Sequence, residues 1–157
     1  MTRRIYDLSQ DISGDAYRKL LVTASEYCDT FLLVVRKSVR MTESAEQVLD
    51  KLQPFLLQQT EESEWPGTRL FGRSATVFRL RLNHSSSAIL MEATDSLYSW
   101  LQPALPEDLC LLRSDGSPWL TSITHEKDAY LELSPDEYKS LCEAVPELVG
   151  IITVPDV

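Results

Sequence analysis

Histidine chemistry is the first possibility that the residue types raise, and the sequence gives it little support. The chain has two histidines, His84 and His125. His125 and Glu126 begin like the zinc-binding helix of a metalloprotease, but position 129 holds alanine instead of the second histidine that this helix needs. His84 is expected to be a solvated residue near the start of a helix. We therefore predict no metal site.

Motifs for nucleophilic catalysis and for nucleotide binding are also missing from the sequence. No serine lies in the Gly-x-Ser-x-Gly turn that exposes a hydrolase nucleophile. The five glycines include no Gly-x-Gly spacing, so we predict no phosphate-cradling loop. We predict no catalytic residue and no cofactor. The members of a catalytic triad can come from anywhere in a chain, so a small enzyme with a site assembled from scattered residues is kept as an alternative.

Neighbouring carboxylates occur as three pairs, Glu61-Glu62, Glu107-Asp108 and Asp136-Glu137. General acid–base catalysis would need burial to shift a carboxyl pKa. The pairs lie in predicted loops or at a helix start, so we expect solvated surface groups. We include Glu107 and Asp108 among the candidate residues for contact with a partner.

A cluster of arginines is a second candidate site. Four of them lie within thirteen residues that contain no acid, namely Arg69, Arg73, Arg79 and Arg81. In one continuous strand their equal parity would place all four on one sheet face, although Gly72 is typical of an interrupted strand. Such a face would be solvated and paired with acids from the C-terminal half, or it would dock an acidic partner or a phosphate.

Trp65 is the best interface candidate among the three tryptophans. It lies in the polar segment 58–68, where Pro66 and Gly67 indicate a surface loop. An exposed tryptophan is costly unless it packs against something, and tryptophan is common at interaction hot spots. The sequence therefore predicts a protein contact at Trp65.

The charge of the chain is unevenly distributed. The net charge is −9; residues 1–83 hold 12 basic and 11 acidic residues, and residues 84–157 hold 3 and 13. A nucleic-acid binder needs cations against phosphate, so this distribution argues against nucleic acid as a partner. The acidic half favours attraction of a basic protein.

Length and apolar pattern indicate one globular domain, residues 1–157, in the cytoplasm. No apolar run approaches the roughly 20 residues that cross a bilayer, and the N-terminus lacks the apolar core of a signal peptide. We therefore expect no membrane contact. The three cysteines, Cys28, Cys110 and Cys142, are odd in number and widely spaced, so we expect free buried thiols in a reducing compartment.

The apolar pattern predicts an α/β (α+β) fold, with helices packed on one mixed sheet. Helices are expected after caps at Ser13, Thr42, the segment 83–87 and Ser134. Asp115-Gly116 predicts a hairpin turn inside a C-terminal three-stranded antiparallel meander. The predicted strands cover residues 3–8, 31–35, 76–82, 109–113, 119–124, 129–133 and 148–154.

Several stretches resemble a group of small uncharacterised bacterial proteins, some of which carry a stage III sporulation label. These stretches are Leu105–Leu109, Asp115–Leu120, His125-Glu126, Ala129–Leu133, Asp29–Arg36 and Glu64–Thr68. The resemblance implies a bacterial cytosolic protein and brings no catalytic residues.

These observations favour a non-enzymatic interaction module. The leading form is an acidic immunity- or adaptor-type protein whose C-terminal half binds a basic partner protein. The alternatives are the small enzyme named above and a structural subunit of a larger assembly, and a homo-oligomer is compatible with each.

Overall fold

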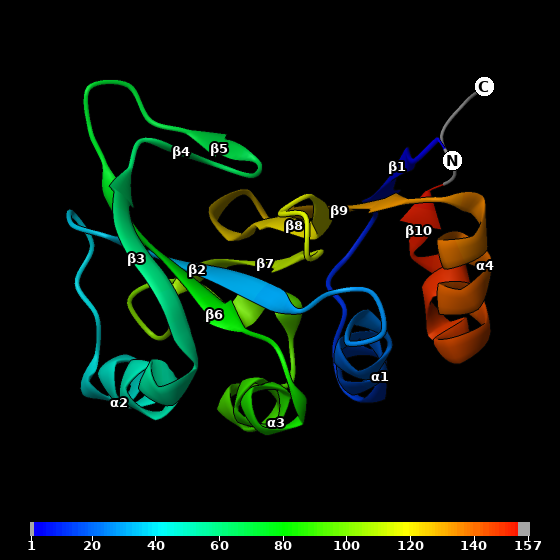
Figure 1. Ribbon diagram of the computed structural model, residues 1–157, viewed down its shortest axis with the longest axis horizontal. Helices are drawn as coiled ribbons and strands as arrows, with labels where there is room; N and C mark the ends of the chain where they lie inside the picture. Colours follow the sequence, from blue (N-terminus) through cyan, green and yellow to red (C-terminus); the bar gives the residue numbers. More distant parts are fainter. Residues whose placement is uncertain (1, 154–157) are drawn as a thin grey trace.

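The computed structural model describes residues 2–153, in which an eight-stranded sheet carries four α-helices (Figure 1). The strand order is β10-β1-β9-β8-β7-β2-β6-β3. The strands are β1 (Arg4–Leu8), β2 (Thr30–Arg36), β3 (Leu56–Glu62), β6 (Ala75–Arg81), β7 (Glu107–Leu112), β8 (Pro118–Ile123), β9 (Asp128–Leu133) and β10 (Ile152–Thr153). A separate two-stranded hairpin consists of β4 (Glu64–Trp65) and β5 (Thr68–Arg69).

The helices cover one face of the sheet, and the β4–β5 hairpin lies over the other (Figure 1). The helices are α1 (Asp15–Ala24), α2 (Glu43–Leu52), α3 (His84–Ala93) and α4 (Pro135–Ala144). Alternation along β2 shows the two faces: Phe31 and Leu33 belong to the large apolar cluster under the helices, and Leu32 and Val34 to a smaller cluster under the hairpin. A central strand with both faces covered is accordingly apolar at every position from 31 to 35.

Three of the predicted helix caps are confirmed. Thr42, Asn83 and Ser134 each accept a hydrogen bond from the backbone N–H three residues later, and Asn83 and Ser134 form complete capping boxes. The predicted cap at Ser13 is wrong, since α1 begins after Gly14.

The predicted fold class is confirmed, as is the meander of β7, β8 and β9 followed by α4. Every strand pairing within residues 2–153 is antiparallel. Strands that flank one common neighbour therefore run parallel, so α2 crosses from β2 to β3 over β6, and α3 crosses from β6 to β7 over β2. Of the predicted terminal strand 148–154, residue 154 lies outside the described residues. The rest is a 3-10 turn, Pro146–Gly150, followed by β10.

The predicted surface loop at 58–68 is wrong. Most of it is edge strand β3, continued by β4 of the hairpin. The physical reason is that an edge strand pairs on one side only and leaves several of its side chains in water, so Gln58, Gln59 and Glu61 are exposed without harm. The polar composition of this exposed edge strand is therefore similar to that of a surface loop, which is why the sequence suggested one.

Candidate functional site

A buried polar cluster, here named the Arg36 network, joins the sheet to the hairpin. It consists of Arg36, Trp65, Glu107, Asp108 and Thr124. Arg36 ends β2, Trp65 is on the hairpin, the two carboxylates begin β7, and Thr124 follows β8. Four segments that are far apart in sequence thus meet at one point.

Asp108 is the centre of this network. Its side chain is fully buried and its backbone is left-handed, with φ of 57°. Oδ2 accepts a hydrogen bond of 3.0 Å from the Trp65 indole N–H. Oδ1 accepts two bonds of 3.0 Å, from the backbone N–H and the hydroxyl of Thr124. A buried carboxylate needs such partners, and these tie the hairpin to the sheet.

Arg36 supplies the positive charge that compensates the carboxylates. Its Nε donates to Glu107 Oε2 at 2.7 Å, and Nη2 lies 3.8 Å from Asp108 Oδ2. The guanidinium carbon lies 5.4 Å from the centre of the Trp65 ring, in cation–π geometry. The Gln102 side chain accepts a bond from the Arg36 backbone N–H at 2.6 Å and donates one to the Arg36 carbonyl at 3.2 Å. Arg36 is therefore held at both its backbone and its side chain.

Glu107, Asp108 and His125 could in principle hold a metal, because each places a ligand atom within 4.8 Å of the other two. In this structure, however, both carboxylates hold the Arg36 guanidinium, whose Nη2 also lies 3.4 Å from His125 Nδ1. A guanidinium occupies the place that a cation would take, so the donor set fits the arginine and not a metal. Asp108, being fully buried, offers no reactive surface to a substrate.

The expected exposure of Trp65, Glu107 and Asp108 is wrong. Trp65 is only 3% exposed, and the two carboxylates are also buried. The sequence suggested exposure because glutamates surround Trp65 and prolines precede Glu107. The hairpin folds back over the sheet and brings Trp65 onto Asp108, so these side chains make contacts within the fold.

The four candidate arginines do not share one strand. Arg79 and Arg81 lie on β6, on the face covered by the hairpin, whereas Arg69 lies on β5 and Arg73 in the connection between the two strands. Arg79 pairs at 2.6 Å with Glu62 of the neighbouring edge strand, not with an acid of the C-terminal half. This hydrogen bond lowers the pKa of Glu62.

A pocket of about 270 Å³ opens beside the Arg36 network. Here named the basic pocket, it is lined by Arg36, Lys37, Ser38, Leu70, Arg73 and Ser74. The connection after β2 supplies one wall and the segment 70–74 the other. Only Arg73 of this set was a candidate from the sequence. The signal that could have found the others is the basic exit of β2, where Arg36 and Lys37 follow a buried apolar run.

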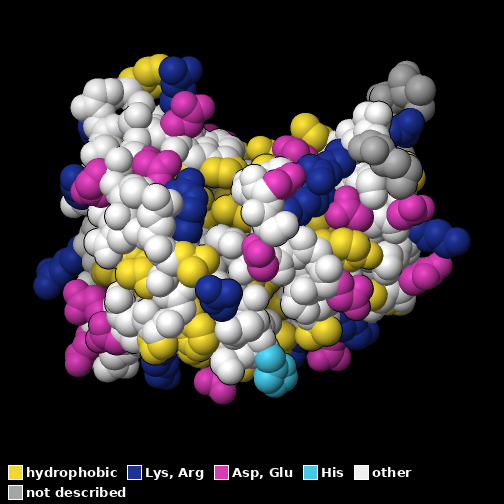
Figure 2. All heavy atoms as spheres, viewed as in Figure 1, with side chains coloured by type: hydrophobic (Ala, Val, Ile, Leu, Met, Phe, Trp, Pro, Cys, Tyr) yellow, Lys and Arg dark blue, Asp and Glu magenta, His cyan; other side chains and the backbone are white. Residues whose placement is uncertain are grey.

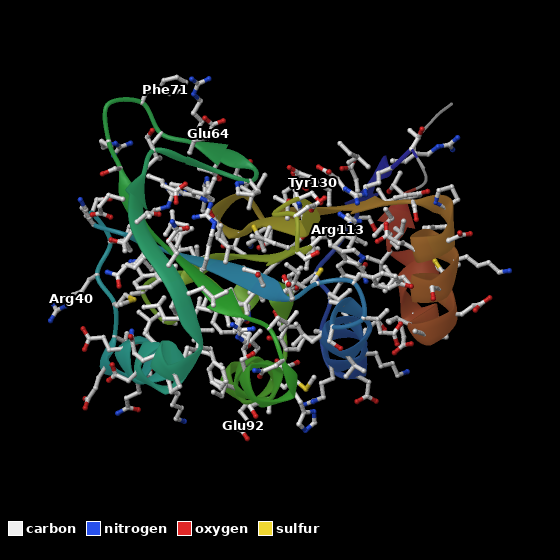
Figure 3. The ribbon with its side chains drawn as sticks, viewed as in Figure 1. Arg40, Glu64, Phe71, Glu92, Arg113 and Tyr130 are labelled. Carbon is white, nitrogen blue, oxygen red and sulfur yellow. The ribbon has the colours of Figure 1, made fainter. Side chains whose placement is uncertain are left out.

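The segment 70–74, here named the 70–74 loop, stands out from the sheet beside the hairpin (Figure 3). Phe71 in this loop is 81% exposed, the highest value among the exposed large apolar residues of the described chain. The Arg69 guanidinium lies 5.7 Å from the centre of the Phe71 ring. Figure 2 shows apolar and basic atoms side by side on this projection.

The cysteines form no disulfide, and all three are free. Burial raises the pKa of Cys28 and of Cys110 to about 12. Both thiols are therefore protonated at neutral pH, which disfavours nucleophilic chemistry. Cys142 is only partly buried, in contrast to the expectation for all three.

No protein-family model, curated protein or solved structure matched this chain. The resemblance to small bacterial proteins accordingly stays a prediction. Among the described residues, no helix has the length and apolar character needed to cross a membrane.

The close packing of the hairpin gives a direct test of its role. Gly67 turns the hairpin with φ of 85°, and a β-carbon there would lie 2.8 Å from Ile123 Cγ1 and from Thr121 Cγ2. We expect G67A to lower the free energy of unfolding by about 2–3 kcal/mol, because strain and a steric clash add. Urea denaturation measures this change.

The matched control is G116A. Gly116 has φ of 87° and open space around it, so its substitution adds strain without a clash and should cost about 1 kcal/mol. Equal losses in the two variants would contradict a tightly packed hairpin.

Proposed function

We propose that the protein is a non-enzymatic, cytosolic bacterial interaction module that docks an acidic protein partner through the 70–74 loop. The observation that carries the proposal is the exposed Phe71 beside Arg69 and Arg73. Aromatic and arginine side chains are enriched at binding hot spots. A large exposed aromatic at a projecting tip is more easily explained by a partner than by folding.

The charges of the loop specify the chemistry of the partner. Neither Arg69 nor Arg73 forms an ion pair within residues 2–153. Both guanidinium groups are therefore free to bind carboxylates, which they can do through two parallel hydrogen bonds. The partner that fits is an acidic protein segment with an apolar residue to pack on Phe71.

The arginine loop is preferred over the acidic C-terminal half as the docking surface. Four of the acids in residues 84–157 pair with basic residues inside the fold or at its surface. Glu107 and Asp108 hold Arg36, Glu137 holds Arg113, and Glu147 pairs with Lys19. Figure 2 shows the remaining acids of the visible face interspersed with basic side chains and not gathered in one patch.

The test is site-specific photo-crosslinking in cells of the native host. A photoreactive amino acid replaces Phe71, and a matched bait carries it at Val149, another exposed apolar position that is 64% exposed. We expect one dominant crosslinked protein at position 71, attached through a peptide of net negative charge. The crosslink should vanish in the R69E/R73E background and be missing from the position 149 bait.

Three results would contradict this proposal. They are the same crosslinks at positions 71 and 149, a crosslinked peptide of net positive charge, and a crosslink only to a second copy of the chain. The last would identify a homo-oligomer, which sedimentation of the purified protein would confirm.

A further inference from the structure

The basic pocket differs in charge from the rest of this acidic protein. The residues that line it include three that carry cationic groups, Arg36, Lys37 and Arg73, and two that carry hydroxyls, Ser38 and Ser74. No acid lines it, although the chain carries a net charge of −9. Cations and hydroxyls that converge on one cavity are the donor set of an anion site.

Arg36 is a rigid part of this donor set. Glu107 fixes its Nε, Asp108 lies near Nη2, and no hydrogen bond from Nη1 is found within residues 2–153. The two carboxylates are buried, so they weaken the field of Arg36 but hold its guanidinium in place beside the cavity that Arg36 lines. A guanidinium held in place before binding loses little freedom when an anion arrives.

The other donors are available to a ligand. Arg73 forms no ion pair in the described part of the chain, and the hydroxyls of Ser38 and Ser74 make no hydrogen bond there. Lys37 pairs at 2.6 Å with Glu61, but both side chains are about half exposed or more. Such surface pairs are weak, so an anion can take the place of the glutamate.

From this arrangement we infer that the basic pocket binds the phosphate group of a phosphomonoester. A phosphate presents three terminal oxygens that accept hydrogen bonds from several sides, which suits donors on both walls of the cavity. A volume of about 270 Å³ also leaves room for part of the molecule that carries the phosphate. Leu70 supplies the one apolar contact for that part. This binding needs no protein partner, and it shares only Arg73 with the surface proposed to dock one.

The test is calorimetric titration of the purified protein with inorganic phosphate, at constant ionic strength. We expect saturable binding at one site, with a Kd on the order of 1 mM. The variant K37Q/R73Q should weaken it at least about tenfold, since two of the three cations are lost. R40Q is the matched control, because Arg40 belongs to the same connection, points away from the molecule and does not line the pocket (Figure 3). It should retain the Kd within about twofold.

Two further titrations distinguish the sources of the phosphate. Tighter binding of phosphoserine than of inorganic phosphate would indicate a phosphorylated protein, and tighter binding of adenosine monophosphate would indicate a nucleotide. The inference is overturned if wild-type protein shows no saturable phosphate binding, or if R40Q loses as much affinity as K37Q/R73Q. Circular dichroism confirms that the variants are folded, and Lys37, Arg40 and Arg73 are all exposed.

Discussion

Replacing Arg36 with methionine is expected to lower the free energy of unfolding by about 3–5 kcal/mol. Methionine keeps much of the length of the side chain and removes the charge. Glu107 and Asp108 would then be buried without their cation, and an unpaired buried charge is much more costly than a missing contact. Urea unfolding at neutral pH, followed by circular dichroism, measures the loss.

Two further variants separate this effect from a general loss of packing. R40M removes an exposed arginine and should change stability by less than about 0.5 kcal/mol. R36M/E107Q also removes the negative charge of Glu107, which R36M leaves buried without a cation, and should recover part of the stability lost in R36M. If R36M/E107Q is no more stable than R36M, the cost does not come from unpaired carboxylates.

Replacing Arg113 with methionine is the second large expected effect, a loss of about 3–5 kcal/mol. Arg113 is buried, and its Nη2 donates to Glu137 Oε1 at 2.8 Å and to the Glu132 carbonyl at 2.7 Å. Nη1 donates to the Pro118 carbonyl at 2.8 Å. The variant would leave the Glu137 carboxylate and the carbonyl groups of Pro118 and Glu132 without the hydrogen bonds from Arg113, at the junction of the meander and α4.

The same pair makes stability depend on pH in a defined direction. Burial alone would raise the pKa of Glu137, but hydrogen bonds from Arg113 and from the Ser134 backbone outweigh it, and the pKa lies below its usual value. A carboxyl with a lowered pKa in the folded state stabilises the protein above its unfolded pKa of about 4.3. This contribution is lost as the pH falls through the folded value.

We therefore expect wild type to be more stable than E137Q at neutral pH, with a difference that shrinks below about pH 4.3. Denaturation of both proteins across a pH series measures it. A difference that stays constant down to pH values below the folded pKa would contradict an ionised Glu137 bound to Arg113. E143Q, at an exposed glutamate of the same helix, is the control and should follow wild type.

Local signals in the sequence predicted much of the fold. The caps at Thr42 and Ser134 depend on bonds within three residues, so the sequence pattern suffices to find them. The turn at Asp115-Gly116 likewise depends on the preference of glycine for a left-handed backbone, and β7 and β8 pair across it. Strands with both faces covered, such as β2, are recognisable as continuous apolar runs.

The candidate site was less predictable because its residues meet only through the tertiary fold. Glu107 and Asp108 look like surface acids until Arg36, 71 residues away from Glu107, is placed beside them. Trp65 looks like a loop residue because its burial depends on a hairpin with strands of two residues each. Neither the hydrophobic periodicity nor the amino-acid composition of the sequence indicates which residues far apart in the chain will meet.

The pairing of β1 with β10 has a practical consequence for experiments on this protein. Asp7 pairs with Thr153 and Leu8 with Ile152, so the first and last strands of the described chain lie together at one edge of the sheet. The 70–74 loop lies toward the opposite edge, where it leads from the hairpin into β6 (Figure 1). A biosensor chip or a fluorescent protein attached near either of these strands would be held away from Phe71 and the basic pocket, and would leave both open to ligands.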